Sequence, residues 1–427
     1  MITLLFVSFF VLFVLRVPVA FALFLSSLLV IVVGGIPTLV VIQKTFEGMT
    51  PFPILAIPLF YLVGILSNTG GFTDRIMDLA RSLVGGIRAG LAHVNIVASM
   101  LFAGVSGSST ADTAGIGSVL IPQMLRAGYS KPFTVAVTAC SSTMGNVIPP
   151  SIMMVIYGAF GNVSIGMLFL AGFIPGLLLG LGQMAMVYFI ARRYDFGLED
   201  PSEKPRILPS LGRGLLPLGV PVVIIGGIVG GVFTPTESAA VALLYVLALS
   251  FFYLRELTLW SLWEQLREAG LFVAIPLIMV ATAVLFGWVL AYHEFPQTMV
   301  EMAKYFGATP TGVFFFVAAL FLVLGCFLDV IPAVIMFLPV IQALGDSAGI
   351  HPVQLGIVVV LTAAFGLVTP PYGVCLLLAA QIADLPIKRA IMMALAMGSV
   401  GIVVILLAIF IPDLTLFLPR TLMPQYF

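Results

Sequence analysis

Long apolar runs separated by short polar segments make up most of the chain. Residues 2–34 are apolar except around Arg16 and Pro18, which predict two helices with a break between them. Residues 51–68 and 163–191 are each long enough to cross a bilayer core, which takes about 20 apolar residues. Such runs recur along the sequence and predict an all-α polytopic membrane protein with roughly ten to twelve crossings.

The stretch 104–151 departs from this pattern because Gly, Ser and Thr replace the large apolar residues. The apolar pieces 90–105 and 113–126 are each too short for a full crossing. They predict a re-entrant hairpin over about 90–126, because non-helical backbone inside a bilayer is tolerated only against protein or a water-filled cavity. Residues 132–160 predict a long helix that is broken at GNVIPP, where two prolines remove backbone donors.

Three segments are too polar to cross a bilayer. Residues 38–50 are one of them, and the run 72–84 predicts an amphipathic arm helix at the membrane interface. Residues 192–213 form a polar linker whose five basic residues place it in the cytoplasm by the positive-inside rule. This linker separates a first unit, residues 1–191, from a second, residues 214–427.

The second unit repeats the order of the first. Prolines and aspartates correspond at an offset that rises from 217 to 221 residues, as a few inserted residues produce. The corresponding positions are Pro18 and Pro235, Pro58 and Pro276, Asp112 and Asp329, Pro122 and Pro339, Pro132 and Pro352, and Pro149–Pro150 and Pro370–Pro371. An ordered series of this kind indicates an internal duplication.

The duplication predicts the same elements in the second unit. These are arm helices at 257–268 and 296–306, a hairpin over about 310–345, a broken helix over 353–381 and a final helix. An odd number of full crossings in each unit makes the two repeats inverted. The fold class favoured by the sequence is therefore two inverted repeats, each with a re-entrant hairpin and a broken transmembrane helix, although the sequence leaves the parity open.

Composition supports a membrane protein and excludes several other classes. The chain is 61% hydrophobic and 8% charged, whereas globular proteins carry roughly 25% charged residues. Its formal net charge is zero, and it has no basic tail of the kind that binds nucleic acid. Three cysteines and three histidines are scattered without metal-ligand spacing, so sodium rather than a transition metal is the expected ion.

A helix that stops inside the membrane leaves terminal carbonyl or amide groups without intrahelical partners. Carbonyl ends suit Na⁺, and amide ends suit a carboxylate. The first predicted cation site comprises Ser106, Ser108, Ser109 and Asp112, opposite Ser142, Asn146 and Pro149. The second comprises Gly325 and Asp329, opposite Gly366, Thr369 and Pro370. The substrate is expected between the two tips, lined by Ser108, Ser109, Thr110 and Thr369.

The same residues have plainer interpretations. Clusters of Gly, Ser and Thr commonly serve close helix packing in membranes. Asp112 could cap the helix that follows the first tip, and this role is compatible with ion binding. Thr234-Pro235-Thr236-Glu237 has the pattern of a helix-capping box, so Glu237 is assigned to structure.

Two other functional classes deserve comparison. A pair of intramembrane aspartates could form an aspartyl protease dyad, in which two carboxylates share a proton at close range. Here each Asp follows a separate hairpin tip, and the nearest text to a GxGD motif is GCFLD. A channel is disfavoured because the chain has no recognisable filter motif. The sequence therefore predicts a transporter and not an enzyme.

Several motifs together resemble a known family. The segment SGSSTADTAGIGSVLIPQM, then SSTMGNVIPPS, TPTESAA, FLD and TPPYG, are similar to the large membrane subunit of tripartite ATP-independent periplasmic (TRAP) transporters. The resemblance extends from RVPVAFAL to the last helix. It implies Na⁺-coupled uptake of an organic acid across the bacterial inner membrane by an elevator-type ion-transporter fold. In that family the cation sites lie at the tips and breaks, which corresponds here to Ser106, Asp112, Asn146, Gly325, Asp329 and Thr369.

The resemblance also implies partners. These are a periplasmic substrate-binding protein and a small membrane subunit of about four helices, within a lipid bilayer. The chain shows no extra N-terminal helices, so the small subunit is expected as a separate chain. A stand-alone Na⁺/dicarboxylate carrier of similar architecture is the alternative, and it needs no binding protein.

Overall fold

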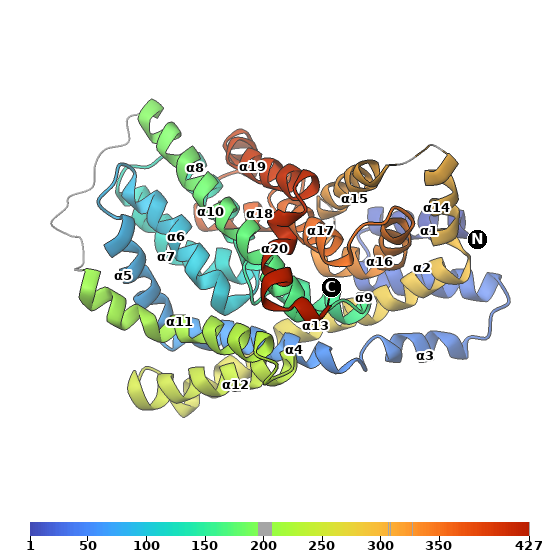
Figure 1. Cartoon of the computed structure of the whole chain (residues 1–427), viewed down its shortest axis with the longest axis horizontal. Coiled ribbons are helices and arrows are strands. Elements are labelled where there is room, and N and C mark those ends of the chain that lie inside the picture. Colours follow the sequence, from blue (N-terminus) through green and yellow to red (C-terminus); the bar gives the residue numbers. More distant parts are fainter. Residues whose placement is uncertain (195–206, 306, 308, 327, 427) are drawn as a thin grey trace.

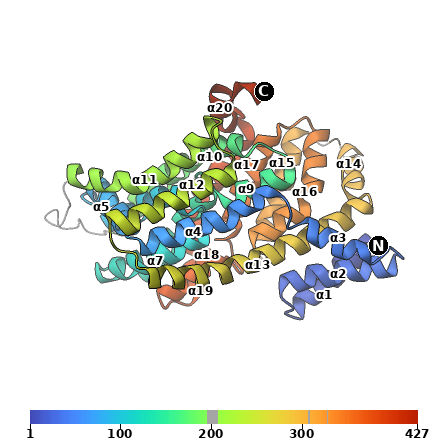
Figure 2. The same ribbon diagram turned by 90° about the horizontal axis from the view of Figure 1, so that it is seen from below.

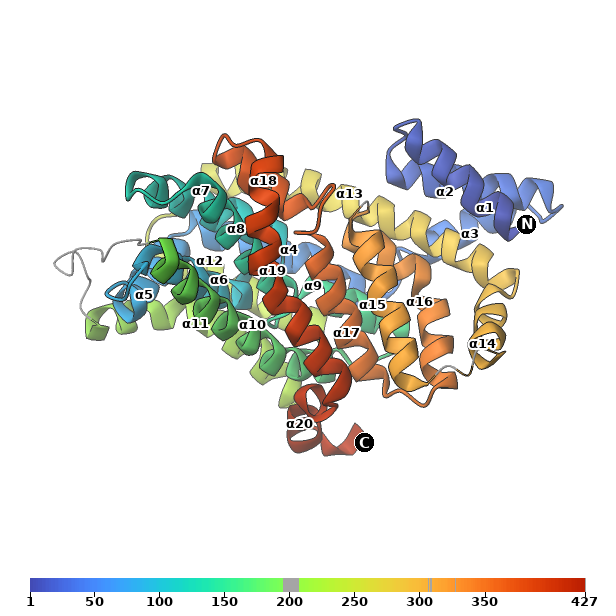
Figure 3. The same ribbon diagram turned by 90° about the horizontal axis from the view of Figure 1, so that it is seen from above.

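The computed structural model describes residues 1–194, 207–305, 307, 309–326 and 328–426, and these fold into helices without strands. Figures 1–3 show the helices from three directions, with the first hairpin near one end of the molecule and the second near the other. The residues that join the two units, 195–206, lie outside the described part of the chain. The polar linker was predicted at 192–213, but helices already cover residues 192–194 and 207–213.

The first unit contains ten α-helices among the described residues. These are α1 (Ile2–Val14), α2 (Val19–Val33), α3 (Leu39–Glu47), η1 (Phe52–Leu55, a 3-10 turn), α4 (Ala56–Thr69), α5 (Phe72–Val84), α6 (Gly90–Ser106), α7 (Ser109–Arg126), α8 (Lys131–Ser142), η2 (Thr143–Asn146, a 3-10 turn), α9 (Ile152–Gly161) and α10 (Ile165–Tyr194). The predicted break after the first helix is confirmed, with Arg16 in the left-handed region at φ +64°.

The second unit has the same order of hairpin and broken helix. Its elements are α11 (Ile207–Val229), α12 (Pro235–Ala248), η4 (Leu249–Tyr253, a π-helical turn), α13 (Leu259–Tyr292), α14 (Phe295–Tyr305), α15 (Pro310–Gly325), α16 (Val330–Ser347), α17 (Pro352–Gly366), α18 (Val374–Ile382), α19 (Ile387–Phe410), α20 (Asp413–Leu422) and η5 (Pro424–Tyr426). The two predicted helical hairpins, α6–α7 and α15–α16, are therefore confirmed. The inversion of one repeat relative to the other stays a prediction.

Seven helical segments in the described part of the chain are long and apolar enough to cross a membrane. Six further apolar helices are shorter, with 10–17 residues. The expectation of ten to twelve crossings was too high for full-length spans. The physical reason is that both arms of a hairpin and both halves of a broken helix are short, so apolar runs overcount complete crossings.

The second arm is not a separate helix. Residues 257–268 were expected to match the isolated arm of the first unit, but α13 runs without interruption for 34 residues from Leu259. The first unit has prolines at positions 51 and 53, which separate α3 from α4. No proline occurs between Leu259 and Pro276, so the corresponding segment stays helical. Figure 2 shows α13 as a long rod beside α4.

The helices between the two hairpins pack into one body. The final long helix, α19, contacts both α8 and α17, one from each broken helix (Figure 3). The amphipathic helix α5 buries Phe72, Ile76 and Leu79, while Asp74 carries charge in its first turn. Its apolar side faces α6 and α11, as the sequence pattern predicted for an amphipathic helix.

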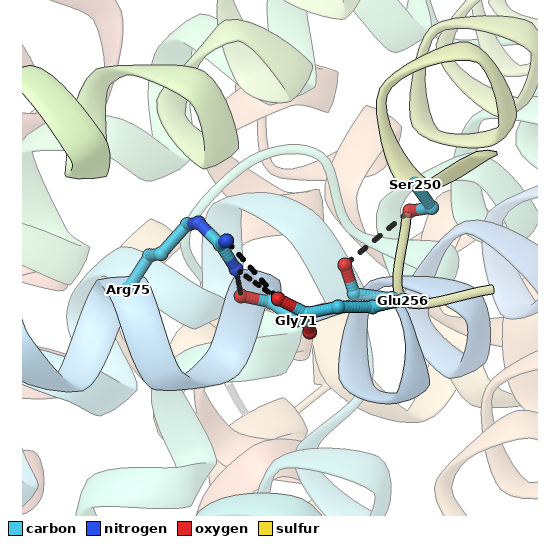
Figure 4. A network of polar contacts seen from close by, with 5 residues as sticks. Gly71, Arg75, Ser250 and Glu256 are labelled. Atoms are coloured by element: carbon cyan, nitrogen blue, oxygen red, sulfur yellow. Dashed lines mark hydrogen bonds and ion pairs between the residues drawn. The ribbon is translucent and has the colours of Figure 1, made fainter. Parts of the chain in front are cut away.

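A polar network fixes the corner between α4 and α5 (Figure 4). The Arg75 guanidinium donates to the Glu256 carboxylate at 3.0 Å and to the carbonyl of Gly71. Ser250 donates to the carbonyl of Gly70 at 3.5 Å. Gly71 has φ +82°, and a Cβ there would lie 1.8 Å from the Glu256 carboxylate. Glycine therefore permits the close approach of this corner to the loop before α13.

We expect Arg75→Met to loosen this corner, because Arg75 joins it to a segment 181 residues away. The free energy of unfolding should fall by about 1 kcal/mol, the upper range for a partly exposed ion pair. The measurement is the melting temperature of the purified protein in detergent. Lys44→Met is the control, since it removes a local pair with Glu47 on α3. An equal loss in both variants would contradict a special role for the corner.

Candidate functional site

The first hairpin turns sharply at Gly107. Helix α6 ends at Ser106, Gly107 adopts φ +64°, and Ser108 caps the start of α7 by accepting from the Ala111 N–H at 3.5 Å. A Cβ at position 107 would lie 2.9 Å from the carbonyl oxygen of Pro150. Glycine therefore allows the left-handed turn and brings the tip against the broken helix.

The predicted interruption of the first broken helix is confirmed. Helix α8 ends at Ser142, one 3-10 turn follows, and α9 begins at Ile152 with Ser151 as its cap. Between them lies the Pro149–Pro150 pair, which cannot supply the donors that a continuous helix needs. The N–H of Ile152 donates to the carbonyl of Gly107 at 3.2 Å, so the hairpin tip is fixed to the break.

Asp112 lies at the centre of the first candidate cation site. Its side chain is fully buried, and one carboxylate oxygen, Oδ1, accepts from the Ser106 hydroxyl. The other oxygen, Oδ2, is buried without a hydrogen-bond partner among the described residues. A buried carboxylate oxygen without a donor is costly, so this position suits a cation.

The tip and the break contact each other directly around this carboxylate. The Ser109 N–H donates to the Asn146 side-chain oxygen at 3.2 Å, and the Ser109 hydroxyl donates to the Thr143 carbonyl at 3.3 Å. A Cβ on Gly145 would lie 2.5 Å from Asp112 Oδ2 and 2.9 Å from the Ser109 nitrogen. Thr143 and Gly145 were not predicted, although glycine beside Asn146 in a broken helix was a usable signal for close approach.

Two predicted members of the first site are turned differently. Ser142 donates to the Thr138 carbonyl of its own helix at 2.7 Å. Pro149 is near Gly104 of the hairpin, where a Cβ would lie 3.7 Å from the Pro149 carbonyl oxygen. The alternative prediction that Asp112 caps α7 is wrong, because Ser108 occupies that position and Asp112 lies one turn inside the helix.

The second tip is built differently. Asp329 caps α16 by accepting from the Val330 N–H at 2.6 Å, and its side chain is exposed. Gly325 at the end of α15 touches Gly366 at the end of α17, since a Cβ on either would lie 2.6 Å from the Cα of the other. Backbone contact replaces the side-chain contacts of the first site. The carbonyl oxygens at these helix ends are therefore the donors on which a cation there would depend.

Residues 367–373 interrupt the second broken helix, as predicted at TPPYG. Thr369 donates its hydroxyl to the Phe365 carbonyl at 2.8 Å, and Pro370 is partly buried beside it. The Cys375 N–H donates to the Leu367 carbonyl at 3.0 Å and so connects the two halves across the gap. Side-chain oxygens are scarcer here than in the first break.

Both hairpin tips line one cavity of about 650 Å³. The first tip contributes Gly107, Ser108, Ser109 and Thr110, the second contributes Asp329, Val330 and Ile331, and the two breaks contribute Asn146 and Leu367. Three of the four predicted substrate residues, those at 108–110, therefore share a cavity. Thr369 is not among the described residues that line it.

The opposite wall of the cavity comes from two helices that were not predicted to contribute. Helix α4 supplies Tyr61 and Asn68, and α13 supplies Gln265 and Glu268. The described lining contains no Lys or Arg, so the start of α7 provides the positive potential that a carboxylate would meet. No local sequence signal distinguished this wall, because its polar residues sit singly in otherwise apolar or amphipathic helices.

Comparison with protein families finds one match over most of the chain. The model for the DctM component of the tripartite ATP-independent periplasmic transporters matches residues 6–414. A sialic acid TRAP transporter large permease protein from Vibrio cholerae is 37% identical over 407 residues, covering 94% of this chain and 95% of the relative. A C4-dicarboxylate TRAP transporter large permease protein from Pseudomonas aeruginosa is 36% identical, covering 89% of each.

Among solved structures, the YdaH transporter of Alcanivorax borkumensis has a similar fold. The TM-score is 0.58 at 16% sequence identity, with 88% of this chain and 87% of the other covered. The crystal structure of YdaH revealed an unusual topology. At this identity the likeness concerns the arrangement of helices alone.

Proposed function

Because this chain belongs to the DctM family of TRAP transporters, we propose that it is the large permease subunit of a Na⁺-coupled importer of a small organic acid. It is a multi-pass transport protein of the bacterial inner membrane and not an enzyme. Relatives are named for sialic acid, C4-dicarboxylates and isethionate, and an organic acid is the class that these share.

Sodium coupling is supported by the oxygen-rich contact between the first tip and its break. The observation that carries the proposal is Asp112 Oδ2, which is buried without a hydrogen-bond partner among the described residues. Carboxylate, hydroxyl, amide and carbonyl oxygens surround this position, and such hard donors suit Na⁺ better than a soft metal. Na⁺ bound there would balance the buried charge and hold the tip on the break.

The cavity between the tips supports the position proposed for the substrate. Ser108, Ser109 and Thr110 present hydroxyl groups at the start of α7, where the helix dipole favours a carboxylate. We place the acid against this helix start. The proposed transport step is an elevator movement, in which the hairpins and broken helices carry substrate and Na⁺ past the remaining helices.

Two partners belong to the proposal. A periplasmic binding protein delivers the acid, and a small membrane subunit completes the permease. In two relatives the matched region is only part of a longer permease chain, which the present chain covers to 66% and 64% of its length. In the present case the small subunit is proposed to be a separate chain.

Transport by reconstituted vesicles tests the proposal and its alternative. Vesicles containing this chain and its small subunit receive labelled sialic acid, a C4-dicarboxylate or isethionate, with and without the periplasmic binding protein. We expect uptake only with an inward Na⁺ gradient and only when the binding protein is present. Na⁺-driven uptake without it would favour a stand-alone carrier. Equal uptake when choline replaces Na⁺ would reject sodium coupling.

A further inference from the structure

A ladder of buried polar side chains joins the first arm of hairpin 1 to the first half of its broken helix. The Asn95 amide donates to the Thr138 hydroxyl at 2.7 Å, and the Ser141 hydroxyl donates to the Asn95 carbonyl oxygen at 3.1 Å. The Ser99 hydroxyl donates to the Ser141 oxygen at 3.0 Å. All four side chains are fully buried, and we call them the α6–α8 ladder.

The second repeat makes the equivalent helix contact without these groups on the hairpin arm. At the offset of 217 residues that relates Asp112 to Asp329, Asn95 corresponds to Gly312 and Ser99 corresponds to Phe316. Neither side chain carries a hydrogen-bonding group. Nevertheless, α15 packs against α17, as α6 packs against α8. Packing of a hairpin arm on a broken helix therefore does not by itself require polar side chains.

The other half of the ladder is also replaced. At the offset of 220 residues that relates the two helix starts, Thr138 corresponds to Val358 and Ser141 to Leu361. At the offset of 221 found at the double prolines, Ser141 corresponds to Thr362, whose hydroxyl donates to the Val358 carbonyl of its own helix. The polar bridge between the two helices is thus particular to the first repeat.

Stability alone gives little reason for the ladder. A hydrogen bond between membrane helices contributes on average about 0.6 kcal/mol, and buried polar groups are costly when a partner is lost. Directional bonds do, however, fix the rotation and register of two helices, which apolar contacts leave less defined. The ladder is better explained by what lies at the end of the two helices.

Both walls of the first candidate cation site continue from the ladder. Helix α6 ends at Ser106, which bonds Asp112, and Ser141 lies next to the last residue of α8. Two residues further on, Thr143 offers its carbonyl to the Ser109 hydroxyl at 3.3 Å. A rotation of the last turn of α8 would therefore move these carbonyl oxygens relative to the buried carboxylate.

We infer that Ser141, held by Asn95 and Ser99, is a positioning residue for the first cation site. It fixes the last turn of α8 on α6 so that the oxygens of the break face Asp112. This inference rests on the proposed Na⁺ coupling. The second site, where Gly325 touches Gly366 by backbone alone, has no such device in the corresponding positions.

The test uses Na⁺ alone as the probe. The purified full-length chain is heated at increasing NaCl, with choline chloride holding ionic strength constant, and the Na⁺ concentration giving half of the maximal protection is measured. For Ser141→Ala we expect this concentration to rise roughly three- to tenfold, at the low end of what loss of a ligand-orienting partner costs in metal affinity. The maximal protection at saturating Na⁺ should remain.

Three further variants separate positioning from general stability. Ser99→Ala removes only the rung nearest the site and should raise the half-protecting Na⁺ concentration in the same direction. Ser141→Thr keeps the hydroxyl and should restore the wild-type value. Thr362→Val removes a buried hydroxyl at the matching place of the second repeat and should leave the Na⁺ value unchanged, whatever it does to the melting temperature without Na⁺.

The outcomes distinguish this inference from the proposed function. Wild-type protein that gains no protection from Na⁺ overturns both. If Na⁺ protects the wild type, but Ser141→Ala and Ser99→Ala alter only the melting temperature without Na⁺, the ladder is structural and only the positioning role is overturned. An equal Na⁺ shift in Thr362→Val would overturn it as well.

Discussion

Gly145→Ala should lower Na⁺-driven uptake roughly tenfold or more, because overpacking costs about 1–3 kcal/mol and 1.4 kcal/mol is tenfold in an equilibrium constant. The added Cβ would lie 2.5 Å from Asp112 Oδ2 and 2.9 Å from backbone atoms of Ser108 and Ser109. Backbone cannot give way as a flexible side chain can, so the tip must move away from the break. Ion sites tolerate shifts of only about 0.5 Å.

The matched control is Gly226→Ala. Gly226 lies in helix α11, and a Cβ there would meet nothing within 4 Å. Alanine has the higher helix propensity, so this variant should keep full uptake. Uptake by reconstituted vesicles is measured per amount of correctly folded protein. Equal activity of Gly145→Ala and Gly226→Ala would mean that the tip does not depend on this close contact.

Removing the two carboxylates one at a time should affect Na⁺ dependence unequally. Asp112→Asn should raise the Na⁺ concentration for half-maximal uptake roughly tenfold or more, since a fully buried charge interacts strongly in a low dielectric. Asp329→Asn should have a smaller effect, because Asp329 is exposed to the cavity and water screens its charge. Alanine at either position should weaken Na⁺ dependence in the same order.

Asp413→Asn is the control for loss of a carboxylate, because Asp413 is an exposed residue paired with Arg420 at the start of α20. It should not change the Na⁺ concentration for half-maximal uptake. Unchanged Na⁺ dependence in both Asp112 and Asp329 variants would falsify the assignment of cation sites to the tips. A larger effect at Asp329 than at Asp112 would show that burial does not decide which site binds more strongly.

The hairpins and the breaks could be predicted because their signals are local. Proline pairs interrupt a helix wherever they occur, and a piece of about 15 apolar residues cannot cross a bilayer in any fold. The duplication added a second independent indication for each element. It also misled in one place, since the isolated arm of the first unit was transferred to residues 257–268, where no proline separates it from α13.

The orientation of individual side chains could not be predicted in the same way. Ser142 and Thr369 belong to the predicted sites, yet each donates its hydroxyl to a carbonyl of its own helix. A hydroxyl near a helix end has this local partner available at all times, and the sequence cannot say whether a tertiary contact competes with it. The same limit applies to Asn68 and Glu268, whose place in the cavity depends on how whole helices pack.

By itself the sequence determined that this chain fills a membrane with helices, that it repeats its plan, and that each repeat stops a helix between a tip and a proline pair. These properties follow from apolar length, spacing and backbone chemistry, which act within a short segment. Only the tertiary structure decided that Gly145 touches Asp112, that Asp329 is open to the cavity while Asp112 is closed, and that Ser141 is held by Asn95. Each of these contacts joins residues that different helices bring together, and the free energy of such contacts depends on distances that no local pattern encodes.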